Sequence, residues 1–221
     1  MPQWMHHSFN ALPDAGFVSL SDLGLDPTLK DIITRLRSIF VQHEIPVSLG
    51  RSRFLSTTDF HDLACFVLHR LLLLPPFETA VNLSATSSEC MRLGVSVYTF
   101  LIHGSTYYSH AVMVTSLVAQ LKYHLERLVS SDTSHSLLLW LMSIGTVASL
   151  GTNQNEWFRG LAITVSLPLG IGCWEDVEVH LRRVLWLDSP ATVLFQQTWE
   201  EIIQSNPSLQ NLARAEDINR S

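Results

Sequence analysis

One uncharged stretch of the sequence, LLLWLMSIGTVASL at residues 137–150, limits most strongly what this chain can fold into. Ser134 and Ser136 stand before it as candidate helix N-caps, and Gly151 follows it as a candidate C-cap. Apolar side chains would cover every face of this helix, so it is expected to be buried on all sides. At about 1.5 Å per residue the stretch reaches roughly 21 Å, which is short of the ~30 Å core of a bilayer. The sequence therefore predicts the central helix of a soluble helical domain.

Small and aromatic residues around this stretch indicate how its neighbours would pack. Four small residues would let other helices approach closely, namely Ser143, Gly145, Thr146 and Ser149. Five tryptophans are spread over the last four predicted helices: Trp140, Trp157, Trp174, Trp186 and Trp199. Because each ring buries a large area, these tryptophans are expected to lock helix against helix. The alternative is that some of them line a small-molecule pocket.

The composition leaves the chain little polar material with which to cover a surface. Hydrophobic residues make up 47% of its 221 residues and charged residues 15%, whereas about 25% is usual for charged residues. Such a chain either buries a large core or hides apolar surface against a partner. The net charge is −6, and the lysines are limited to Lys30 and Lys122. Because neutralising phosphates needs clustered cations, we expect no DNA binding by this chain alone.

The cysteines and the N-terminus bear on the compartment. Cys65, Cys90 and Cys173 are odd in number and far apart, which favours a reducing compartment over a disulfide framework. The first ten residues, MPQWMHHSFN, have no basic start followed by an apolar run, and they are not Arg-rich and amphipathic. The cytosol or the nucleus is therefore expected. The pair His6-His7 in this segment is a weak metal candidate.

Helical periodicity, together with the capping and helix-breaking residues between the periodic segments, predicts an all-α fold, an irregular multi-helix bundle of about eight helices. Asp26 and Pro27 provide an N-cap and a first helical residue for the first of them. We expect an irregular N-terminal arm at 1–25, a helical domain at 26–204 and a frayed tail at 205–221. The expected helices cover about 27–45, 57–74, 86–103, 109–129, 137–150, 156–167, 174–187 and 191–204.

The sharpest metal candidate is the segment HDLACFVLH, in which His61, Cys65 and His69 are spaced four residues apart. Two ligands at this spacing can hold zinc on one helical face. The third residue lies roughly 12 Å from the first along the helix axis, too far to share one ion. We therefore predict no metal site, and we interpret Cys65 as a core cysteine flanked by two histidines near the core margin.

No nucleophile or phosphate motif is convincing, so we predict no catalytic residue, no cofactor and no enzyme. Ser96 lacks the flanking glycines of a nucleophile elbow, and Cys90 after Glu89 is more typical of a core residue. The segment GIGCW at 170–174 has two glycines but no preceding strand. HGS at 103–105 is expected to be a helix-ending turn. The acidic residues expected to be solvated rather than catalytic are Glu175, Asp176, Glu178, Glu200 and Glu201.

Four segments in order resemble the regulatory domain of fungal zinc-cluster transcription factors. They are ECMRLGVSVYTFLIHG, LLLWLMSIGTVASLGTNQNEWF, WEDVEVHLRRVLWLD and a closing TWEEI. In that family a segment like LLLWLMSIG precedes a Trp-Phe pair, here Trp157-Phe158. A helix ending in Leu-Trp-Leu-Asp follows, here at 185–188, and then a Trp-Glu pair, here Trp199-Glu200. The resemblance covers about residues 60–203.

The resemblance implies an all-helical domain that modulates activation, dimer contacts and effector response in the nucleus. Family members usually begin with a six-cysteine binuclear zinc cluster that reads DNA, and this sequence has none. We therefore expect a chain without autonomous DNA binding. It is either a truncated regulator (or a partial gene model) or a protein that works by joining a protein partner, another regulator or a second copy of itself.

Three other functions stay open beside a transcription-regulation interaction domain. The first is a domain of the same fold that senses a small metabolite among the tryptophans. The second is a helical hydrolase that uses Cys90 or one of the histidines. The third is a membrane hairpin formed by residues 137–150 and 161–173.

Overall fold

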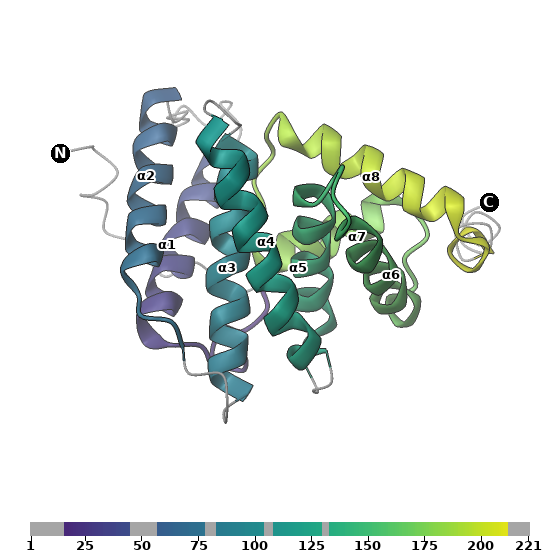
Figure 1. Ribbon diagram of the computed structural model, residues 1–221, viewed down its shortest axis with the longest axis horizontal. Helices are drawn as coiled ribbons and strands as arrows, with labels where there is room; N and C mark the ends of the chain where they lie inside the picture. The colour runs from purple at the N-terminus through teal and green to yellow at the C-terminus, as the bar shows by residue number, and fades with distance from the viewer. Residues whose placement is uncertain (1–15, 45–56, 78–82, 104–107, 130–132, 212–221) are drawn as a thin grey trace.

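The computed structural model describes residues 16–44, 57–77, 83–103, 108–129 and 133–211, and Figure 1 shows their arrangement. The described residues contain helices and turns but no β-strand, which confirms the predicted all-α multi-helix fold. The helices are α1 (Pro27–Glu44), α2 (Thr57–Leu73), α3 (Leu83–His103), α4 (Tyr108–Leu128), α5 (His135–Ala148), α6 (Asn155–Ser166), the 3-10 helix η3 (Leu167–Leu169), α7 (Trp174–Val184) and α8 (Ala191–Ser205).

Helix α5 lies in the middle of the bundle, as its sequence predicted. It contacts α3 and α4 on one side and α6, α7 and α8 on the other (Figure 1). Every residue from Ser136 to Val147 is buried. The helix begins two residues before the predicted stretch and has Ser149 as its C-cap, so Gly151 is not the cap. Gly151 follows in the tight turn with φ +75°, a left-handed conformation that favours glycine.

Small residues on α5 bring its neighbours into close contact. A Cβ atom at Gly145 would lie 2.1 Å from Cε1 of Phe158 on α6, so this position accepts only glycine without movement. The indole N–H of Trp199 on α8 donates to the Ser143 hydroxyl at 3.0 Å. The Asn155 amide at the start of α6 donates to the Thr146 carbonyl at 2.8 Å. The predicted role of these residues in helix packing is confirmed.

Helix α7 is shorter than the sequence predicted, since it ends before Leu185 rather than near Trp186. Two buried hydrogen bonds hold the chain in an extended path beyond the helix. The Trp140 indole donates to the Leu185 carbonyl at 2.6 Å, and the Leu187 N–H donates to the Tyr98 hydroxyl at 2.8 Å. These partners from α5 and α3 replace the bonds that a further helical turn would make.

The two flanks of the helical domain differ in how well the sequence predicted them. The Asp26 carboxylate accepts hydrogen bonds from the N–H groups of Thr28 and Leu29, so the predicted N-cap of α1 is confirmed. Residues 207–211 form further helix, and Leu209 within it is buried. That part of the predicted tail is therefore packed and not frayed. Residues 1–15, which contain His6-His7, and 212–221 lie outside the described residues.

The described helices offer no candidate membrane span. None of them combines the length and the apolar character that crossing a bilayer requires. The hairpin of 137–150 and 161–173 has no support in this fold, because residues 161–173 contain the end of α6, η3 and a turn.

Candidate functional site

His61 and Cys65 on α2 face His103 at the end of α3. The Nδ1 atom of His61 lies 2.7 Å from Nε2 of His103. The Nε2 atom of His61 lies 3.5 Å from the Cys65 sulfur. Cys65 is exposed, so its interpretation as a core cysteine was wrong. Sequence patterns did not identify His103 as the partner of His61, because the two residues are 42 positions apart and lie on different helices. A thiol, an imidazole and a second imidazole in series can pass a proton. However, His61 and Cys65 are exposed and His103 is only half-buried, so solvent reaches the cluster.

His69, the third residue of the metal candidate, lies apart from this cluster. His69 is exposed on the same helix and does not join His61, Cys65 and His103. Among the residues that the structure describes, no group of three or more His, Cys, Asp or Glu side chains is arranged to hold a metal ion.

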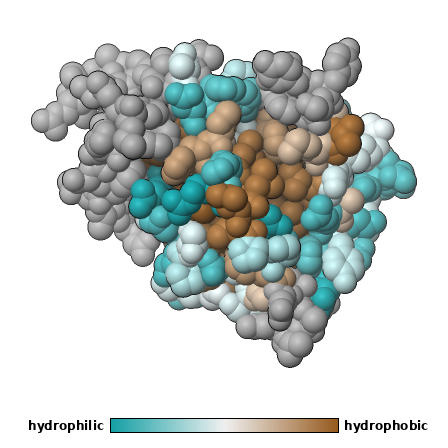
Figure 2. Space-filling model, turned by 60° about the vertical axis from the view of Figure 1, so that its left-hand side comes forward, coloured by the Kyte–Doolittle hydropathy of each residue, from teal (hydrophilic) through white to brown (hydrophobic). Residues whose placement is uncertain are grey.

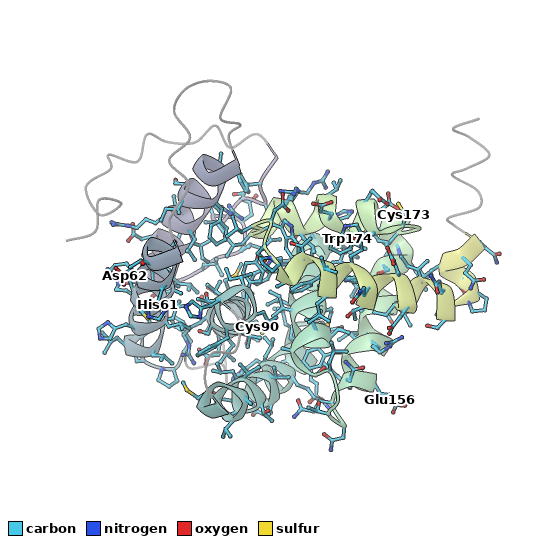
Figure 3. All side chains as sticks on the ribbon, turned by 90° about the horizontal axis from the view of Figure 1, so that it is seen from above. His61, Asp62, Cys90, Glu156, Cys173 and Trp174 are labelled. Carbon is cyan, nitrogen blue, oxygen red and sulfur yellow. The ribbon has the colours of Figure 1, made fainter. Side chains whose placement is uncertain are left out.

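Cys90 is buried among the residues of α3 and is poorly suited to act as a nucleophile. Burial and, to a smaller extent, the charge of Glu89 raise the pKa of the Cys90 thiol. The neighbouring Glu89 carboxylate pairs with Arg92 at 2.5 Å, and both side chains are buried. Arg92 also reaches the Leu71 carbonyl at the end of α2. Arg92 thereby ties α2 to α3. Figure 3 shows Cys90 in the middle of the bundle, apart from Cys173.

The glycine segment at 170–174 forms the entry turn of α7. The Asp176 carboxylate accepts hydrogen bonds from the N–H groups of Gly172 and Cys173, at 2.9 and 3.0 Å. These donors are the groups that a phosphate loop would use, and here the protein itself satisfies them. Burial is the largest cause that raises the pKa of the Cys173 thiol to about 12.

The remaining sequence candidates occupy structural positions. The Ser96 hydroxyl is buried and donates to the Arg92 carbonyl at 2.8 Å. Glu178 pairs with Arg182, while Glu200 accepts from Gln196 and Glu201 from Arg159. His103 ends α3 as expected, whereas Gly104 and Ser105 lie outside the described residues.

Tryptophan side chains join helices inside the bundle. Trp140 and Trp199 are completely buried, and their indole N–H groups are bonded inside the protein. Trp174 packs against Trp186, whose ring also packs edge-on against Phe195. Trp186 lines a small cavity of about 90 Å³.

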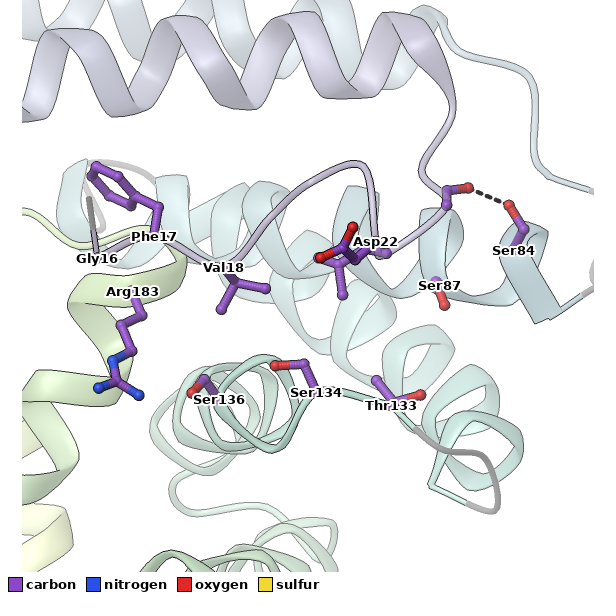
Figure 4. Close-up of a pocket in the computed structure, with 12 residues that line it drawn as sticks. Gly16, Phe17, Val18, Asp22, Ser84, Ser87, Thr133, Ser134, Ser136 and Arg183 are labelled. Atoms are coloured by element: carbon purple, nitrogen blue, oxygen red, sulfur yellow. Dashed lines mark hydrogen bonds between the residues drawn. The ribbon is translucent and has the colours of Figure 1, made fainter. Parts of the chain in front are cut away.

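A larger cavity of about 740 Å³, lined by both polar and apolar side chains, lies at the N-terminal end of α5 (Figure 4). Its walls come from the segment before α1, the first turns of α3 and α5, and the end of α7. Seven polar residues line it: Asp22, Ser84, Ser87, Thr133, Ser134, Ser136 and Arg183. Sequence reasoning named two of these serines as helix caps and did not predict the cavity, since its walls are up to 167 positions apart.

The cavity is electrostatically uneven along its length. Arg183 and Ser136 lie toward one end, while Asp22 lies toward Ser84 and Ser87 (Figure 4). The Ser136 hydroxyl is 2.9 Å from Nδ1 of His180. Burial lowers the pKa of His180, and the positive charge of Arg183 lowers it further, partly offset by Asp176. His180 is therefore predominantly neutral at pH 7, and the positive charge at this end comes from Arg183.

Comparison with known proteins gives no relative for this chain: no protein-family model, no curated protein and no solved structure matches it.

Proposed function

We propose that this chain is a helical regulatory domain that acts through protein contacts in transcription regulation. The proposal follows the resemblance of its sequence to the fungal zinc-cluster regulators, which also makes the nucleus its expected location. The structural observation that supports it is the exposed apolar surface of α2 and α4. An all-helical scaffold with such a surface suits a protein that works by contact.

The apolar surface lies on the face formed by α2 and α4. Figure 2 shows hydrophobic residues gathered in the centre of this face, with hydrophilic residues around them. Leu73 on α2 is 68% exposed and Val112 on α4 is 74% exposed. Leu72 beside Leu73 and Met113 beside Val112 are exposed as well. The two pairs lie toward opposite ends of this face, because α2 ends near the start of α3, whereas α4 begins just after the end of α3. Covering these side chains with a partner protein would remove apolar area from water, which favours association.

The charge of the chain supports contact with protein more than contact with DNA. A net charge of −6 opposes binding to a polyanion unless cations are clustered against it. In this proposal the chain reaches its genes through another protein. An electrophoretic mobility assay with the purified chain should show no sequence-specific retention of DNA, and tight specific retention would contradict the proposal.

A tethered reporter assay tests the contact surface directly. The chain is fused to an unrelated DNA-binding module, and transcription of a reporter is measured with wild type, Val112→Asp and Val193→Asp. Val193 is a matched control, because it is 57% exposed on α8, away from the α2–α4 face. The fusion should change reporter output, and Val112→Asp should remove most of that change while Val193→Asp keeps it. Equal output from both variants would count against the surface.

The cavity at the N-terminal end of α5 favours a second candidate function, the sensing of a small metabolite. Its volume of about 740 Å³ lies within the range of known ligand pockets, roughly 300–1,000 Å³. Because the end of α7 and the segment before α1 both line it, a ligand there would bridge α7 and the segment before α1. Thermal unfolding with a broad metabolite panel tests this function. Stabilisation by no member of the panel would contradict it.

A further inference from the structure

The Arg183 end of the cavity offers unused positive charge. The Arg183 side chain is exposed, lines the cavity, and makes no hydrogen bond or ion pair with any described residue. The first turn of α5 lies beside it and contains no acidic residue. The first hydrogen bond within α5 runs from the Leu138 N–H to the Ser134 carbonyl, so the preceding N–H groups have no partner inside the helix. The side chain of Ser134 makes no capping bond with them.

A buried hydroxyl in the cavity wall also lacks a partner. Ser87 on α3 is only 6% exposed and lines the cavity. Its hydroxyl makes no hydrogen bond with the rest of the described chain, unlike that of Ser84, which donates to the Gly24 carbonyl. Because Ser87 lines the cavity, its hydroxyl can pair with water or with a ligand there. The unpaired hydroxyl of Ser87, which lies on α3 and not on α5, is therefore a second, independent indication of a polar ligand in this cavity.

The opposite end limits what the rest of a ligand can be. The Asp22 side chain is exposed to the cavity and makes no bond with the described residues. Its carboxylate would repel a second anionic group and attract hydroxyl or ammonium donors. The cavity therefore presents donors at one end and an acceptor at the other.

We infer that this cavity binds a small metabolite with a carboxylate or phosphate group at the Arg183 end and hydroxyl or ammonium donors toward Asp22 and Ser87. The inference rests on the metabolite-sensing function proposed above and names the ligand class of that site. The oxyanion accepts hydrogen bonds from Arg183 and from the first turn of α5, as anions do at helix N-termini.

Isothermal titration calorimetry with four probes separates the parts of the inference. Glycerol 3-phosphate and L-serine carry an oxyanion together with hydrogen-bond donors. Succinate carries two anionic groups, and glycerol carries hydroxyl donors but no anionic group. Glycerol 3-phosphate or L-serine should bind, and which of the two binds more tightly tells phosphate from carboxylate recognition. Succinate should bind more weakly and glycerol should give no heat. Binding of glycerol at equal strength would overturn the anionic class while leaving a ligand pocket in place.

Two arginine variants locate the binding. Arg183→Met should weaken the better probe about tenfold or more, since it removes a charge-assisted contact. Its fold should persist, because Arg183 is exposed and its side chain bonds to no described residue. Arg159→Met on α6 is the matched control, with the same change of charge away from the cavity, and should bind as wild type does. An equal loss in both variants would show general charge attraction and overturn the assignment.

Amide chemical shifts give a readout that does not depend on affinity. The better probe should shift the backbone resonances of Ser87, Ser134 and Ser136, and these shifts should be absent in Arg183→Met. Shifts confined to other helices would overturn the proposed site. If none of the four probes binds, the inference fails, whereas the protein-contact function keeps its own test in the reporter assay.

Discussion

The two ends of α5 use the same residue types in opposite ways. Toward its C-terminus the Ser143 hydroxyl donates to the Leu139 carbonyl and accepts from Trp199, so the buried polar group is satisfied inside the protein. At its N-terminus Ser134 caps nothing, and Ser87 opposite it has no partner in the described chain. Serines thus complete a closed core at one end and line an open cavity at the other.

This difference separates the end of α5 that stabilises the fold from the end that is available to bind a ligand. The closed end fixes α6 and α8 against α5 through tight packing and paired hydrogen bonds, which leaves no room for a ligand. The open end keeps donors and an acceptor exposed to a cavity of about 740 Å³. Substitutions at the closed end should therefore change folding, whereas those at the open end should change binding.

The largest effect is expected from Gly145→Ala at the closed end. The added Cβ atom would collide with the Phe158 ring, so the free energy of unfolding should fall by about 3 kcal/mol or more. Gly160→Ala on α6 is the matched control, since nothing lies within 4 Å of its Cβ position, and it should stabilise by about 0.5–1 kcal/mol. Urea unfolding measures both. Equal stability of the two variants would contradict the close packing of α5 against α6.

A somewhat smaller effect is expected at Arg37, which joins the end of α7 to the segment before α1. Its buried guanidinium donates to the carbonyls of Val184 at 2.7 Å and Val18 at 3.1 Å, and lies 4.7 Å from the Phe17 ring centroid. Arg37→Met should cost about 2–4 kcal/mol, because it leaves buried carbonyls unpaired.

Arg35→Met, on the same helix, is the control for that substitution. The Arg35–Asp31 pair is about half exposed, so its loss should cost less than about 0.5 kcal/mol. Thermal unfolding compares the two variants. A wild-type melting temperature for Arg37→Met would show that this arginine does not hold the cavity wall in place.

The closed end could largely be predicted from the sequence, whereas the open end could not. The uncharged run of α5 and its small residues are local sequence patterns, and both are found as predicted in the structure. The Asp26 cap of α1 is another local pattern that the sequence predicted correctly. The end of α7 was misjudged, because its buried bonds come from Tyr98 and Trp140 on other helices. The cavity and the His61–His103 pair join residues distant in sequence, and no periodicity signals which of them will meet.

Ser143→Ala and Ser87→Ala compare the two ends with the same substitution in buried serines. Ser143→Ala should lower the free energy of unfolding by about 1–2 kcal/mol, since it leaves the Trp199 N–H unpaired. Ser87→Ala breaks no bond with the described chain and should change it by less than about 0.5 kcal/mol. Urea unfolding without any ligand measures both. A larger loss for Ser87→Ala would mean that its hydroxyl supports the fold.

The smallest effect concerns pH and His124 on α4. Burial lowers the pKa of His124, and the charges of Arg127 and Arg92 lower it further while Glu89 opposes them. In the unfolded chain His124 binds a proton near pH ~6.5, whereas in the folded chain its lowered pKa delays protonation to lower pH. Because the unfolded state then binds more protons, the free energy of unfolding falls as pH decreases below that value. His180 should act in the same direction. His124→Gln should therefore flatten the dependence of the urea midpoint on pH between 7 and 5, and an unchanged slope would contradict this assignment.

The contrast between the two ends of α5 can be measured within one helix by amide hydrogen exchange, with and without glycerol 3-phosphate or L-serine, whichever binds more tightly. The account predicts slower exchange at His135, Ser136 and Leu137 when the probe is bound. It also predicts no change from Ser143 to Ala148, where the structure is already closed. Uniform protection along α5, or none at its first turn, would contradict an open, ligand-accepting end on a closed core.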